Sequence, residues 1–223
     1  KVLAKELYHD ERAIIKLDMS EFSEQHSTSK LLGSPAGYVG HKERNHFTDN
    51  IRKRPHSIIL FDEIDKAHRD VTKLLFQILD EGTLTDSSGK KTTFTNTIII
   101  LTTNLGSDLF QSNGIGFEKD GTQATKERDK NITNKLKEEL SSALLNRIGS
   151  THIFSPLAET DIKKIVEKNI QAISEILFEK EKISLKTEIP AISHLTKQSF
   201  NQEFGARHVE KTIQDALHEL IVE

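Results

Sequence analysis

Several residue types and patterns are missing from this sequence, and each absence excludes a class of protein. There is no cysteine among the 223 residues, which excludes disulfide bonds and thiolate metal sites and favours a reducing compartment. No apolar run approaches the roughly 18 residues that a membrane-spanning helix needs. The first twelve residues, KVLAKELYHDER, are charged and amphipathic, so we do not expect them to be a secretory signal.

An excess of charge of one sign is also lacking. The 31 basic and 34 acidic residues give a net charge of -3, which provides no general attraction to nucleic acid or to acidic membranes. The small basic cluster from Arg52 to Arg54 is therefore interpreted as a solvated helix end. A phosphate-binding Gly-x-x-x-x-Gly-Lys-Ser/Thr loop is absent too, and the nearest stretch, SSGKKT, has the wrong spacing.

The hydrophobic pattern of the first two thirds of the chain predicts an α/β fold. Two runs, SIILF at 57–61 and TIIIL at 97–101, are apolar on both faces, which is typical of central strands in a parallel sheet covered by helices. Further strands are predicted at 13–17 and 151–154. Helical spacing at 2–8, 42–54 and 71–79 separates the strands, so we expect a parallel sheet with helices around it.

The pattern changes near Pro156, which predicts a domain boundary there. Residues 161–182 form a long amphipathic stretch typical of a helix, and strand signals become rare. We therefore predict an α/β domain over 1–156 and a small, mostly helical domain over 157–223. The small domain is expected to hold further helices at 192–195 and 209–222 and a brief strand at 183–185. The polar segment 113–130 is predicted to be a loop.

Two acidic residues directly follow the first central strand. The stretch IILFDE places Asp62 and Glu63 at the strand end, where open α/β sheets bind their ligands. In nucleotide hydrolysis the first acid can hold Mg²⁺, directly or through water, and the second can polarise the attacking water. The alternative interpretation is a pair of carboxylates that only solvate the strand end.

Three other polar residues are candidates for the same chemistry. Asn104 follows the next strand and is placed to orient the water or to contact the terminal phosphate, unless it only closes a turn before Gly106. Arg147, in LLNRIG, and Arg207, in FGARHVEK, carry guanidinium groups of the kind that stabilise charge on a phosphate. The alternative for each arginine is a surface salt bridge.

Taken in order, these pieces resemble the second AAA+ module of the Clp ATPases, the two-ring protein unfoldases and disaggregases. The resemblance covers nearly the whole chain and rests on RAIIKLDMSEF, GSPAGYVGH, RKRPHSIILFDEIDKAH, LLFQILDEGTLTD, FTNTIIILTTNLGS, LLNRI and FGARHVEKTIQD. It implies an AAA+ large α/β subdomain over 1–156, a small subdomain of the Clp D2 type over 157–223, and ATP and Mg²⁺ as cofactors. The implied function is an ATP-dependent unfoldase that threads polypeptides through the pore of a homo-hexamer.

The resemblance also implies a role for each candidate residue. Asp62 and Glu63 match the Walker B motif, with Asp62 near Mg²⁺ through water, and Asn104 matches sensor 1. Arg147 matches the finger that is contributed to the neighbouring subunit's ATP, and Arg207 matches sensor 2. Two departures bear on the posture of Arg147. The stretch ELSSALLNR replaces the family's Phe-Arg-Pro-Glu-Phe before Leu-Asn-Arg, and Ile-Gly replaces Ile-Asp after it.

The glycine-rich stretch GSPAGYVGHKER matches the family's pore loop. In that loop the residues Gly37, Tyr38, Val39 and Gly40 would grip a translocating polypeptide. An aromatic ring offers apolar contact to any sequence, and glycines allow the loop to move. The alternative interpretation is an ordinary turn with a packed tyrosine.

A second stretch, NGIGFEKDG, bears on the partner. Its residues Ile115, Gly116 and Phe117 resemble the tripeptide by which some Clp unfoldases dock on the ClpP peptidase, and which disaggregases generally lack. An exposed Ile and Phe on a loop suit an apolar pocket of a partner. The alternative is that both side chains pack back onto the domain.

The missing phosphate loop leaves several hypotheses open. The resemblance places that loop and the first central strand upstream of Lys1, so we expect a piece of a longer protein that binds ATP poorly by itself. The implied partners are unfolded or tagged polypeptides, a ClpP-type peptidase and adaptor proteins, with no nucleic acid and no membrane. The implied locations are the bacterial cytoplasm and the interior of plastids or mitochondria. The alternatives are a peptidase-independent disaggregase, a non-catalytic binding module and a nucleic-acid AAA+ machine.

Overall fold

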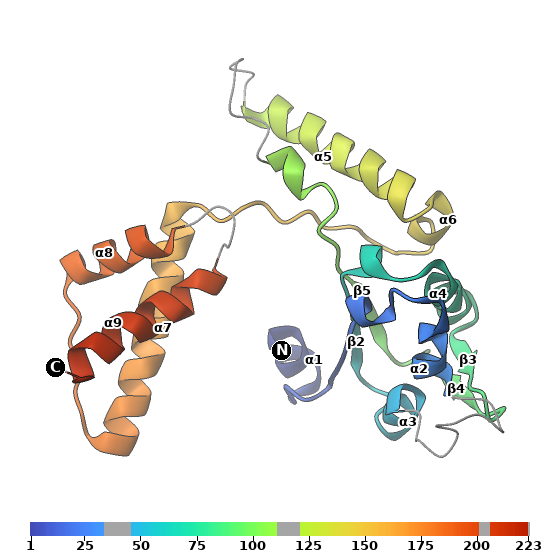
Figure 1. Cartoon of the computed structure of the whole chain (residues 1–223), viewed down its shortest axis with the longest axis horizontal. Helices are drawn as coiled ribbons and strands as arrows, with labels where there is room; N and C mark the ends of the chain where they lie inside the picture. The colour runs from blue at the N-terminus through green and yellow to red at the C-terminus, as the bar shows by residue number, and fades with distance from the viewer. Residues whose placement is uncertain (34–45, 111–120, 201–205, 223) are drawn as a thin grey trace. The chain divides into compact units, whose positions relative to one another are not determined.

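A computed structural model describes residues 1–33, 46–110, 121–200 and 206–222 of the chain (Figure 1). The chain divides into two compact units, Lys1–His152 and Ile153–Glu223. The first unit contains all the strands of the described residues, and the second unit is built from helices. The predicted fold class, a parallel α/β sheet followed by a mostly helical part, is confirmed.

Three parallel strands form the centre of the first unit. They are β1 (Ile14–Asp18), β2 (Ile58–Asp62) and β5 (Ile98–Leu101), in the spatial order β1-β2-β5. The register pairs Asp18 with Asp62, so the carboxyl ends of β1 and β2 coincide. Isoleucine is the most frequent residue in each of the three strands, because a β-branched side chain fits a pleated surface.

Alternation along β2 gives the sheet two buried faces. Ile59 and Phe61 face a large core with the helices α2 (Thr28–Leu32), α3 (His46–Lys53) and α4 (Arg69–Glu81). Ile58 faces the opposite side, where it packs with Ala4 of helix α1 (Val2–Tyr8). Because successive side chains of a strand point to opposite faces, helices on both sides explain the continuous apolar run of β2.

A two-stranded hairpin was not predicted from the sequence. Its strands, β3 (Thr83–Thr85) and β4 (Lys91–Thr93), are antiparallel and mostly polar, and buried Leu84 joins them to the large core. The Asp86 carboxylate closes the turn by accepting the amides of Ser88 and Lys90, each at 3.0 Å, and it pairs with Arg52 of α3 at 3.1 Å. Burial raises the pKa of Asp86, but these partners outweigh burial and hold the pKa below its ordinary value.

The predicted loop over 113–130 is wrong for its second half, because helix α5 spans Gly121–Glu139. Its buried residues Ile132 and Leu136 lie beyond the predicted loop, so the polar first turns carried no apolar stripe that could reveal the helix. Gly106, with φ of +82°, approaches α5 so closely that an added Cβ would lie 3.1 Å from Ile132. The short helix α6 (Ser142–Leu145) follows, and four 3₁₀ turns cover Met19–Phe22, Gln25–Ser27, Ile64–Lys66 and Ser107–Phe110.

The predicted strand at 151–154 is also wrong. These residues have no regular secondary structure, and Phe154 is 89% exposed. A strand is stable only when its backbone pairs with a neighbour, and within the described residues no strand pairs with this segment. The short apolar run was therefore not sufficient evidence for a strand.

Three helices form the second unit: α7 (Glu159–Glu181), α8 (Ile189–Ser199) and α9 (Arg207–Val222). Ile162 and Val166 of α7 pack with Val209 and Ile213 of α9 in its core. The brief strand predicted at 183–185 is absent, because α7 ends in a left-handed residue, Lys182, and irregular chain follows. Of the helices in the described ranges, none is long and apolar enough to cross a membrane.

Candidate functional site at the ends of two parallel strands

The acidic pair lies at the carboxyl end of the central strand. Asp62 is the last residue of β2, and Thr102, Thr103 and Asn104 directly follow β5, which pairs with β2 in parallel. Because both strands run in the same direction, the two polar segments meet at one edge of the sheet. The structure thus brings Asp62, Glu63 and Asn104 together, as their positions in the sequence predicted.

One hydroxyl group connects the two acids. The Oγ1 of Thr102 donates to Oδ1 of Asp62 at 2.5 Å and accepts the backbone N–H of Glu63 at 3.2 Å. The Ile64 amide also donates to the Thr102 carbonyl oxygen at 2.9 Å. Thr102 therefore holds the turn after β2 through its side chain and its backbone.

The backbone of Glu63 turns sharply to allow this arrangement. Its φ of 56° and ψ of 52° are in the left-handed region, which costs a residue with a side chain about 1 kcal/mol or more. The Glu63 carboxylate accepts a hydrogen bond from Nδ2 of Asn104, with 3.3 Å between Oε1 and the nitrogen. Strained backbone at a strand end that also carries an acid and an amide is typical of a functional site.

A lysine from the neighbouring strand completes the surroundings of Asp62. The Nζ of Lys16 on β1 lies 2.6 Å from Oδ2 of Asp62, whose side chain is 29% exposed. The next acid along the sheet edge, Asp18, accepts the hydroxyl of Ser20 at 2.6 Å and its amide at 3.0 Å. These two bonds, with a further contribution from Lys16, lower the pKa of Asp18, so a second ionised carboxylate lies beside Asp62.

Two side chains of the site were not singled out from the sequence. Lys16 lies inside an apolar strand, where only the interruption of AIIKL by a charge signals it. Asp65 accepts the hydroxyl of Thr103 at 2.6 Å, and the Thr103 oxygen also accepts the Leu105 amide at 3.1 Å. Thr102 and Thr103 thus form parallel arrangements, each with one carboxylate acceptor and one backbone donor.

The donor set at the strand ends consists of oxygen atoms, which are the ligands that Mg²⁺ prefers. Asp62 and Glu63 are adjacent in the chain, and the hydroxyl of Thr102 lies between them. Within the described residues, no group of three or more His, Cys, Asp or Glu side chains could hold a metal ion by itself. The oxygen atoms of Asp62 and Glu63 fit a Mg²⁺ ion by their chemistry, and these residues do not fit an all-protein metal cage.

Arg147 lies elsewhere in the first unit. Its Nε donates to Asp80 of α4, its Nη1 donates to the Ala143 carbonyl oxygen at 2.7 Å, and its guanidinium lies 5.1 Å from the centre of the Phe76 ring. The hydrogen bond to Asp80 raises the pKa of Arg147 above its ordinary value, so the guanidinium is permanently charged. These contacts join Arg147 to α4 and to α6, the short helix that precedes it.

The other predicted site residues lie outside the described residues or have side chains outside them. Arg207 is the first residue of α9 in the second unit, and its side chain is not described. The predicted pore loop 37–40 and the predicted docking tripeptide 115–117 lie outside the described residues. Their roles stay predictions.

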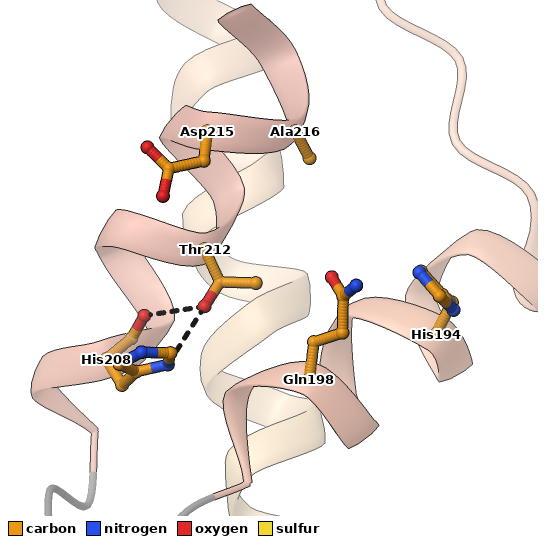
Figure 2. A pocket seen from close by; sticks show the side chains of 6 residues that line it. All are labelled: His194, Gln198, His208, Thr212, Asp215 and Ala216. Carbon is orange, nitrogen blue, oxygen red and sulfur yellow. Dashed lines mark hydrogen bonds between the residues drawn. The ribbon is translucent and has the colours of Figure 1, made fainter. Parts of the chain in front are cut away.

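A pocket of about 450 Å³ lies in the second unit, between α8 and α9 (Figure 2). It is lined by His194, Gln198, His208, Thr212, Asp215 and Ala216. The Thr212 hydroxyl donates to the His208 carbonyl oxygen at 2.9 Å and lies 3.1 Å from its Nδ1, so the hydroxyl serves the helix itself (Figure 2). These contacts serve helix α9, and the strand ends remain the candidate site.

Comparison with known proteins identifies the family. A family model described as "AAA domain (Cdc48 subfamily)" matches residues 1–151, and one described as "C-terminal, D2-small domain, of ClpB protein" matches residues 157–223. The chain belongs to the Clp branch of the AAA family. Its parallel sheet is therefore that of a Clp-type AAA module.

Relatives of this Clp module carry the names of chaperones and of protease subunits. The chaperone protein ClpB of Bacteroides thetaiotaomicron is 42% identical over 96% of this chain and 25% of its own length. The ATP-dependent Clp protease ATP-binding subunit ClpC of Staphylococcus aureus is 38% identical over 100% of this chain and 28% of its own length. The chain thus spans about a quarter of the length of these curated relatives.

A solved structure is similar to the Clp module across its length. A Saccharomyces cerevisiae Hsp104:casein complex in an extended conformation matches with a TM-score of 0.84 and 33% identity. The match covers 99% of this chain and 38% of the Hsp104 chain. The similarity supports the AAA assignment of the first unit and the small-domain assignment of the second.

Proposed function

We propose that this Clp module performs the ATP hydrolysis of a protein-unfolding machine, with the hydrolytic residues at the ends of β2 and β5. The observation that supports it is the single contact network in which Thr102 connects Asp62 to Glu63, and Asn104 donates to Glu63. The sequence has no phosphate-binding Gly-Lys loop, so the proposal concerns the complete protein rather than this stretch alone.

Each residue of the network has one task in this proposal. Asp62 would hold Mg²⁺, and the ion, when bound, would neutralise charge on the phosphates. Glu63 accepts a proton from the attacking water, and Asn104 orients the Glu63 carboxylate through its amide, as the 3.3 Å contact allows. Thr102 holds the Asp62 carboxylate and the backbone amide of Glu63 at the same time.

The remaining predicted residues extend the proposal to a ring. Arg147 contacts the ATP of a neighbouring subunit, and Arg207 contacts the ATP of its own subunit. Hydrolysis moves the pore loop 37–40, and Tyr38 pulls a polypeptide through a homo-hexamer. The division into an α/β unit and a helical unit is consistent with this proposal. The relatives include a bacterial and a mitochondrial ClpB chaperone.

Replacing the carboxylate of Glu63 by an amide tests its proposed role as the proton acceptor in ATP hydrolysis. In the full-length protein, Glu63→Gln should retain ATP affinity and lower kcat by roughly 10²–10⁴-fold, because the amide cannot accept the proton. Glu81→Gln, at the exposed end of α4, is the matched control and should hydrolyse ATP at the wild-type rate. Unaltered turnover in Glu63→Gln would remove Glu63 from the mechanism.

A second candidate function is disaggregation without a peptidase. The relatives include both ClpB chaperones and ClpC protease subunits, so similarity alone does not separate the two. The tripeptide at 115–117 favours a partnership with a ClpP-type peptidase. Capture of that peptidase by the full-length protein, and its loss in Phe117→Ala, would support the first candidate; no capture by either protein would support the second.

A further inference from the structure

The contacts of Arg147 are unusual for a surface arginine because they come from three directions. Asp80 accepts Nε–H, the Ala143 carbonyl accepts from Nη1 at 2.7 Å, and the Phe76 ring lies 5.1 Å beneath the guanidinium. A guanidinium that is held at two nitrogens and supported by a ring cannot rotate about its long side chain. The orientation of its remaining N–H groups is therefore determined by α4 and α6.

The guanidinium N–H groups that do not contact Asp80 or Ala143 are the ones that can bind an anion. Of the five N–H groups, two serve Asp80 and Ala143, and within the described residues Nη2 has no hydrogen-bond partner. The Arg147 side chain is 35% exposed, so an outer edge is accessible. A planar edge with N–H donors is the geometry that binds a phosphate through two parallel hydrogen bonds.

The position of Asp80 has no explanation within its own helix. Asp80 lies in the last turn of α4, which ends at Glu81 and contains no basic residue in that turn. A negative charge at a helix C-terminus is unfavourable, because it adds to the negative end of the helix dipole. The ion pair with Arg147 accounts for the presence of an acid at this unfavourable position of the helix.

We infer that Asp80 is a positioning residue, supported by Phe76, that directs the Nη2 edge of Arg147 outward to a phosphate group of a nucleotide held by a second copy of this chain. The inference rests on the proposed function, because it takes ATP hydrolysis in a ring as given. It goes beyond that function because it assigns to α4 the orientation of a group that acts in the neighbouring subunit.

Double-mutant kinetics of ATP hydrolysis by the full-length ring protein test the inference. Asp80→Asn should lower kcat by about tenfold to a hundredfold, because a small misplacement of the guanidinium removes transition-state contacts, while KM changes little. Phe76→Leu should lower kcat less. Each substitution combined with Arg147→Ala should turn over no more slowly than Arg147→Ala alone, because residues that act as one unit are not additive.

Controls separate positioning from stability and from the proposed function itself. Asp70→Asn removes another aspartate of α4, 32% exposed and paired with Lys73 at 2.8 Å, and should leave kcat unchanged. The urea midpoints and the ring assembly of Asp80→Asn should match the wild type, since exposed ion pairs contribute little to stability. A wild-type kcat in Asp80→Asn, or losses that multiply with Arg147→Ala, would overturn the inference. Wild-type turnover in Glu63→Gln would instead overturn the proposed function.

Discussion

The Thr102 hydroxyl offers the sharpest test of the site, because Thr103 is a matched control in the next position. Thr102→Val keeps the shape of the side chain but removes the donor to Asp62 and the acceptor for the Glu63 amide. A hydrogen bond to a charged group contributes about 1.5–3 kcal/mol. Water can partly replace it, because the Asp62 side chain is 29% exposed, so we expect a loss of about 1–2 kcal/mol of unfolding free energy.

Thr103→Val should cost more unfolding free energy than Thr102→Val, because its hydroxyl also joins one carboxylate to one backbone amide and the Asp65 side chain is only 9% exposed. Urea denaturation followed by far-UV circular dichroism measures both losses, and Thr102→Ser should restore most of the stability. In the full-length protein, ATP turnover should fall by about tenfold in Thr102→Val and remain near wild type in Thr103→Val. Equal turnover in the two valine variants would refute the view that Thr102 organises the catalytic acids.

Three further predictions concern the fold. Asp86→Asn should lower the unfolding free energy at pH 7 by about 1–2 kcal/mol. Because the pKa of Asp86 is lowered in the folded state, the difference between the variant and the wild type should shrink as the pH falls below about 4. Urea titrations at several pH values would measure this difference. Gly106→Ala should destabilise more than Gly89→Ala, since both have positive φ but only Gly106 has a side chain within 4 Å, and equal midpoints would contradict the close contact. Ile162→Ala, in the core of the second unit, should cost about 2–5 kcal/mol, whereas Ile176→Ala, at a side chain that is 53% exposed, should cost far less in thermal unfolding.

Strong local patterns were sufficient to predict the main elements. The strand around SIILF was found because an uninterrupted apolar run has few explanations other than a strand that is buried on both faces. TIIIL is also a strand, but its prediction as a buried central strand is wrong for the described residues, because β5 lies at the sheet edge and Ile98 is 38% exposed. The long helix α7 was found because its apolar residues repeat with helical spacing over six turns. The weakest predictions were the strands at 151–154 and 183–185, where a few apolar residues had no neighbouring strand to pair with.

The candidate site also contains some residues that the sequence predicted and some contacts that only the tertiary structure revealed. By itself, the sequence determined that Asp62, Glu63 and Asn104 follow strand ends, because those residues are adjacent to apolar runs that can be read along the chain. Only the tertiary structure decided that Lys16 reaches Asp62, that Thr102 joins the two acids, and that Asp80 holds Arg147. Those pairs are separated by 39 or more positions, and no local pattern encodes them. They arise from strand register and helix packing, which bring distant residues together when the core forms.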